Sequence, residues 1–103
     1  MTLTGKEKAA LRGEAHHLTA VVHVGKDGVS PALLQSLDDA LRTRELVKIQ
    51  LGRSVDESAR DLAGALADQV GADVVQVIGK TVTLYRHNPE LKRKKDDPPP
   101  WRQ

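Results

Sequence analysis

The residues best suited to chemistry in this sequence form a short loop, Gly25-Lys26-Asp27-Gly28, between a predicted strand and a predicted helix. Its two glycines let the backbone take positive φ twice and let another chain approach without obstruction by a Cβ atom. Lys26 is at the tip, and the following helix points its free N–H groups and positive dipole end to the same place. These groups predict a site for phosphate oxygens. A plain strand-to-helix turn explains the same residues, and short motifs also occur by chance.

Five further side chains are placed where they could extend this site. They are Arg12, His16, Lys48, Lys80 and Arg86. Arg12 and His16 are four positions apart on one face of a predicted helix, so Arg12 could hold a phosphate while His16 donates a hydrogen bond beside it. Each residue also has an ordinary explanation: a solvated or salt-bridged arginine, a histidine that caps a helix C-terminus, or a solvated lysine.

We find no catalytic or metal-binding constellation. The chain has no Cys, which excludes disulfides, thiol catalysis and thiolate metal sites. Gly79-Lys80-Thr81 resembles the end of a P-loop, but the required earlier glycine would fall at Val74, and the segment is typical of a hairpin. We therefore expect no enzymatic activity, no cofactor and no metal.

The basic charge of the chain is concentrated at its C-terminus. The 103 residues can bury one core, and we predict one domain over residues 1–87 and a disordered basic, Pro-rich tail over residues 88–103. From Arg86 onward there are 6 basic and 3 acidic residues, which leaves 10 basic and 11 acidic residues before it. Residues 1–85 thus have a net charge of −1, so the case for a nucleic-acid partner depends on where the cations of the domain lie.

The sequence also limits where in the cell the protein is expected and how it could recognise a nucleic acid. No apolar run approaches the roughly 20 residues that a membrane span needs, and the N-terminus is not a signal peptide, so we expect a soluble cytoplasmic protein. Tyr85 is the domain's one aromatic residue and Trp101 lies in the tail. Recognition by stacking of splayed bases therefore has almost no residues to use.

Hydrophobic spacing and capping residues predict the element order αβαβαββ. Helix starts are predicted at Thr4 with Glu7, at Ser30 with Pro31, and at Ser54 with Glu57. Strands are predicted at Ala20–Val24, Leu46–Leu51, Val74–Ile78 and Thr81–Tyr85. In the first helix, Leu11, Ala15 and Leu18 form the core stripe. We expect an α/β domain with a mixed four-stranded sheet, parallel across the early helical crossovers and antiparallel in the final hairpin.

Five separated blocks of the chain resemble the CRM domain (chloroplast RNA splicing and ribosome maturation). The blocks are Leu11–Gly13, Ala15–Leu18, Val22–Gly28, Glu45–Lys48, and Val75–Thr81 with Leu84–Arg86. The resemblance covers residues 2 to 87 and is nearest to the stand-alone bacterial members. It implies an RNA-binding fold similar to the C-terminal domain of a bacterial translation initiation factor. It also implies that Gly25, Lys26, Asp27 and Gly28 contact RNA.

The resemblance further implies association with precursors of the large ribosomal subunit. We therefore expect a monomeric RNA-binding protein that does not use DNA or a membrane. The alternative is a protein-interaction module that binds a basic ribosomal protein. Its acidic surface would be made by Asp56, Glu57, Asp61 and Asp68, and the glycine loop would then be only a turn.

Overall fold

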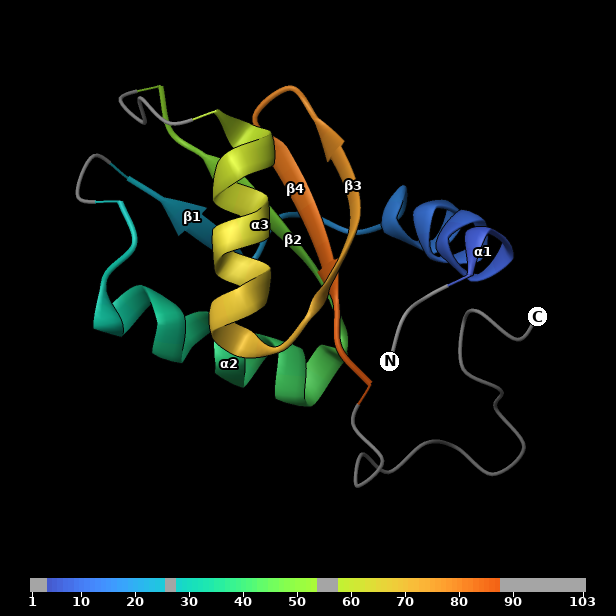
Figure 1. Cartoon of the computed structure of the whole chain (residues 1–103), viewed down its shortest axis with the longest axis horizontal. Coiled ribbons are helices and arrows are strands. Elements are labelled where there is room, and N and C mark those ends of the chain that lie inside the picture. Colours follow the sequence, from blue (N-terminus) through green and yellow to red (C-terminus); the bar gives the residue numbers. More distant parts are fainter. Residues whose placement is uncertain (1–3, 26–27, 54–57, 88–103) are drawn as a thin grey trace.

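The computed structural model describes residues 4–25, 28–53 and 58–87 as an α/β fold in the predicted order αβαβαββ (Figure 1). Its helices are α1 (Gly5–Ala15), α2 (Pro31–Arg44) and α3 (Ala59–Val70). Its strands are β1 (Val22–Val24), β2 (Leu46–Leu51), β3 (Asp73–Ile78) and β4 (Thr81–Tyr85). The predicted tail lies outside the described residues.

The four strands form one mixed sheet in the order β1-β2-β4-β3. β1 pairs in parallel with β2, as the helical crossover between them predicts. β4 is antiparallel to both β2 and β3, so the last strand of the chain lies in the interior of the sheet. The mixed four-stranded sheet is confirmed, and β2 and β3 are separated by a strand that follows both in sequence.

The two faces of the sheet are covered differently. On one face, α2 and α3 bury alternate residues of β1, β2 and β4 against Leu37, Leu41, Leu62 and Leu66. On the other face, α1 covers one end only, in a small cluster of Leu11, Ala15, Leu46, Val75 and Tyr85. Figure 1 shows α1 beside the sheet and away from the other two helices. No described helix covers the rest of this second face.

The first two helices begin at the predicted capping residues. Thr4 and Glu7 form a reciprocal capping box, with N···O distances of 3.0 and 3.1 Å. At the start of α2, the Ser30 hydroxyl accepts the Leu33 N–H at 3.1 Å. α1 ends at Ala15, so Leu18 is beyond the helix and 37% exposed; its predicted place in the core stripe was wrong.

The predicted start of α3 was also wrong. The helix begins at Ala59, and its N-cap is Ser58, whose hydroxyl accepts the Asp61 N–H at 3.1 Å. Ser54 and Glu57 lie outside the described residues. Both serines are followed three residues later by an acidic residue, so the local pattern fits either position, and the later one forms the cap. The helix ends at Gly71 with φ of 67°, as predicted.

Arg86, directly after β4, joins the end of the sheet to both helices of the main core. Its guanidinium donates to the Asp38 carboxylate at 2.7 Å, to the Asp38 carbonyl at 3.1 Å and to the Val70 carbonyl at 2.8 Å. Val70 is the last residue of α3, so Arg86 satisfies a carbonyl that has no partner within the helix. The Arg86 side chain is 23% exposed. These contacts give Arg86 a structural role.

We expect Arg86→Ala to lower the free energy of unfolding by about 1–2 kcal/mol, because it removes charge-assisted hydrogen bonds to α2 and α3. Arg60→Ala is the matched control, because Arg60 is exposed on α3 and has no ion-pair partner among the described residues. Its substitution should change stability by less than about 0.5 kcal/mol. Urea unfolding of both variants tests this, and equal losses would contradict the role of Arg86.

Candidate nucleic-acid interface

Three connections meet at one end of the sheet, which we call the loop end: the loop after β1, the segment after β2, and the β3–β4 turn. Parallel pairing brings the ends of β1 and β2 together, and antiparallel pairing places the start of β4 beside them. The Gly52 N–H donates to the Val24 carbonyl at 2.8 Å, and the Leu51 N–H donates to the Lys80 carbonyl at 2.8 Å.

The glycine loop is a hydrogen-bonded turn whose two glycines differ in backbone conformation. The Gly28 N–H donates to the Gly25 carbonyl at 3.0 Å, which closes the turn. Gly28 has φ of 65°, whereas Gly25 is not among the residues with positive φ. The expectation that both glycines take positive φ was therefore wrong for Gly25. Lys26 and Asp27 lie outside the described residues.

No described atom of the chain fills the space beside Gly25 and Gly28. A Cβ atom built on Gly25 or on Gly28 would meet no atom of the described chain within 4 Å. By contrast, a Cβ atom on Gly52 would lie 3.1 Å from the Val24 carbonyl oxygen. Internal packing thus restricts the side chain at position 52 and leaves positions 25 and 28 free for an approaching molecule.

The start of α2 offers fewer free amides than expected. Pro31, the first helical residue, has no N–H, and the Leu33 N–H already donates to Ser30. Of the first three helical residues, Ala32 alone keeps a backbone N–H without a partner in the described part of the chain. The helix dipole still places partial positive charge beside Gly28.

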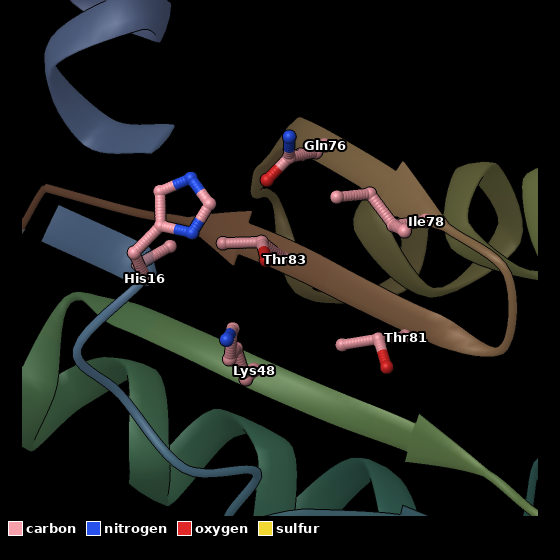
Figure 2. A pocket seen from close by; sticks show the side chains of 7 residues that line it. His16, Lys48, Gln76, Ile78, Thr81 and Thr83 are labelled. Carbon is pink, nitrogen blue, oxygen red and sulfur yellow. The ribbon is translucent and has the colours of Figure 1, made fainter. Parts of the chain in front are cut away.

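The other predicted residues occupy separate places. Lys80 is exposed at the loop end, while Lys48 and His16 line a pocket on the open part of the sheet (Figure 2). Arg12 is half-buried in the last turn of α1 and has no ion-pair partner among the described residues. Arg86 follows the other end of β4, with its guanidinium engaged by Asp38 and Val70. The structure therefore places Lys80 at the same end of the sheet as the glycine loop, with β2 between their strands, and Arg86 at the opposite end.

Two side chains in this region were not among the predicted site residues. Arg53 is exposed at the loop end, directly after β2 and Gly52. His23 points to the open face of the sheet, because its neighbours Val22 and Val24 are buried on the other face. The sequence contains a signal for each. Parallel pairing of the first two strands predicts that Arg53 lies at the same end of the sheet as the glycine loop, and the alternation Val-His-Val predicts that His23 lies on the polar face of its strand.

Acidic side chains gather on the helical layer. Asp61 and Asp68 are exposed on α3, and Asp38 and Asp39 lie on α2. Asp38 and Asp39 are paired with Arg86 and Arg42. The remaining residues of the predicted acidic surface, at positions 56 and 57, lie outside the described part of the chain.

Within the described residues, no group of three or more His, Cys, Asp or Glu side chains is arranged to hold a metal ion. The helices of the same residues are all too short or too polar to cross a membrane.

The two loop glycines should differ in their effect on stability. We expect Gly28→Ala to lower the free energy of unfolding by about 1 kcal/mol, because an L-residue is strained at φ of 65°. We expect Gly25→Ala to cause no loss, because its φ is not positive and its Cβ meets nothing. Urea unfolding compares the two variants, and equal stabilities would contradict the conformation of the turn.

Similar proteins share this fold. The Bacillus subtilis protein named "Probable RNA-binding protein YqeI" is 41% identical over 91 residues, which cover 88% of this chain and 95% of that protein. A Haemophilus influenzae protein named "RNA-binding protein" is 35% identical over 91 residues, covering 88% and 92%. The solution structure of the Staphylococcus aureus protein SAV1595 superposes with a TM-score of 0.76 at 34% identity, covering 88% of this chain and 95% of that one.

The match extends over nearly the whole of the described fold. The family model of the CRS1 / YhbY (CRM) domain matches residues 3–86, which include all seven helices and strands of the described residues together with the glycine loop. The two bacterial relatives named above carry names that describe RNA binding. This chain belongs to the CRS1/YhbY (CRM) domain family.

Proposed function

We propose that this chain binds RNA at the loop end of the sheet and acts in the assembly of the large ribosomal subunit. The observation that carries the proposal is the open glycine loop at the start of α2, in a chain of the CRM family whose relatives are named for RNA binding. The ribosomal part rests on the family resemblance. RNA is the partner, and the chain acts as a monomer without a cofactor.

In this mechanism the loop end clamps the RNA backbone. The backbone around Gly25 and Gly28 lets a sugar-phosphate chain approach closely, and Lys26, Lys80 and Arg53 supply positive charge to the phosphates. Arg12, Lys48 and His16 extend the contact towards α1. Asp27, within the loop, can accept hydrogen bonds from RNA hydroxyl or base N–H groups, whereas its negative charge opposes contact with phosphates.

Recognition works through shape and phosphate position rather than aromatic stacking. Among the described residues, Tyr85 is the one Phe, Tyr or Trp side chain, and it is 2% exposed beneath α1. Its ring is therefore not available to a base. We leave Arg86 out of the interface, because its guanidinium is held by Asp38 and Val70. A structured RNA with a fixed arrangement of phosphates is the target that this surface fits.

A second candidate function uses the opposite layer of the molecule. The exposed carboxylates Asp61 and Asp68 on α3 give that layer an acidic surface that would suit a basic ribosomal protein. This function leaves no role for the open space around Gly25 and Gly28, so we place it second.

Substitutions at the loop end should weaken RNA binding while the fold is kept. We expect Gly25→Val, Lys26→Glu and Lys80→Ala each to lower affinity for a folded fragment of large-subunit ribosomal RNA about three- to thirtyfold. On a single-stranded RNA, about three to five phosphate contacts imply a slope of log K against log salt of about −2 to −3.5, and loss of one lysine should make this slope shallower by about 0.7. Fluorescence anisotropy at several salt concentrations measures both. Arg44→Ala is the control, because Arg44 is exposed at the C-terminus of α2, just before the start of β2 and so at the opposite end of the sheet; equal loss in the control would contradict a localised site.

The ribosomal role can be tested in cell lysate. We expect the protein to co-migrate with large-subunit particles in a sucrose gradient and to leave those fractions after RNase treatment. Asp61→Asn combined with Asp68→Asn should not change this migration. Migration at the top of the gradient would contradict the ribosomal role. Co-migration lost in the double carboxylate variant but retained in Gly25→Val would favour the protein-binding alternative.

A further inference from the structure

The part of the sheet that α1 leaves open presents two rows of side chains set by strand register. The first row crosses three strands and consists of Lys48, Thr83 and Gln76. The second row crosses four strands and consists of His23, Gln50, Thr81 and Ile78. Adjacent strands lie about 4.8 Å apart, so neighbouring side chains in each row form a continuous strip.

A pocket of about 160 Å³ lies where these rows meet the end of α1 (Figure 2). The side chains of three strands and of the α1 C-cap surround it: His16, Lys48, Gln76, Ile78, Thr81 and Thr83. In Figure 2 the His16 ring projects towards the sheet from the side of α1, opposite Ile78 and Thr81. The pocket therefore lies between the end of α1 and the strand residues Ile78 and Thr81, which flank the β3–β4 turn.

The pocket combines an apolar surface with side chains that can form hydrogen bonds to the polar edge of a planar ligand. Ile78 is 58% exposed, which makes it the most exposed large hydrophobic residue among those described. Next to it, the Gln76 amide offers both donors and an acceptor, whereas Thr83 lines the pocket as a side chain that is only 2% exposed. A planar heterocycle with hydrogen-bonding groups on its edge satisfies both kinds of surface.

The charge of the pocket favours an anionic ligand. Lys48 Nζ donates to the Leu18 carbonyl at 3.2 Å, which holds the ammonium at the rim and leaves two of its N–H donors for a ligand. The His16 ring has no hydrogen-bond partner among the described residues. No carboxylate lines the pocket. A phosphate linked to the heterocycle through a sugar would meet Lys48 and His16 without repulsion.

We propose that this pocket binds one unpaired ribonucleotide of the RNA, with the base on Ile78 and against Gln76, and a phosphate on Lys48 and His16. This inference rests on the proposed function, and adds to it a preference for unpaired nucleotides beside the clamp. Thr81 follows Lys80 directly, so the pocket continues from the loop end along β4. A single RNA strand that is bound at the loop end can place its next base on the open face of the sheet. A base inside an RNA duplex cannot do so, because it is paired and stacked.

The test compares one RNA in two states. A fluorescently labelled, unstructured 12-nucleotide RNA containing all four bases is titrated with the full chain, alone and annealed to its complement. We expect Ile78→Ala and Gln76→Ala each to weaken binding of the single strand about three- to tenfold and to change duplex binding less than twofold. Gln69→Ala is the matched control, because Gln69 is exposed on α3, on the other side of the sheet. Ile78 and Gln76 are not in the buried core, so the variants should remain folded, which circular dichroism checks.

The outcomes separate this inference from the proposed function. If Lys80→Ala weakens binding while Ile78→Ala and Gln76→Ala bind the single strand like the unmodified chain, the pocket proposal fails and clamping at the loop end stands. Equal weakening for the single strand and the duplex would also overturn the pocket, because it would indicate a general backbone contact. If the unmodified chain binds neither RNA nor a folded ribosomal fragment, both proposals fail.

Discussion

The pairing of β4 with β2 is the constraint on which the rest of the structure depends. In the observed register, Ile49 lies opposite Val82 and Lys48 lies opposite Thr83. Burial of the apolar pairs beneath α2 and α3 opposes a slip, because a shift by one residue would exchange the two faces of a strand. The same apolar burial that stabilises the domain therefore holds the polar side chains of the adjacent positions on the open face.

The interior position of β4 also separates two groups of charges. At its start, the β3–β4 turn lies at the same end of the sheet as the glycine loop, and hydrogen bonds of Leu51 and Gly52 join β4, β2 and β1 there. At its end, Arg86 is bound to Asp38 and to the C-terminus of α3. One end of the strand thus presents cations to solvent, and the other uses a cation to hold the helices. α1 covers the end near Arg86 and leaves the remainder of the face accessible, which is why a pocket can form beside the clamp.

Short-range features of this chain were predictable from the sequence. Capping residues and hydrophobic spacing act within one or two helical turns, so the order of the elements and the caps at Thr4 and Ser30 could be derived from local residues. The same locality explains the error at α3: Ser54 and Ser58 begin equivalent patterns, and local reasoning does not choose between them. The glycine loop was found as a motif, but which of its glycines takes positive φ depends on how the strand and the helix are oriented.

The sequence by itself determined the elements, the family and the candidate residues. Only the tertiary structure decided which of those residues share a surface. It placed β4 between β2 and β3, brought Lys80 to the same end of the sheet as the glycine loop, paired Arg86 with Asp38 and put Lys48 and His16 around one pocket. The physical reason is that these arrangements arise from hydrogen bonds and apolar contacts between segments far apart in the chain, and residue type and spacing do not specify such contacts one pair at a time.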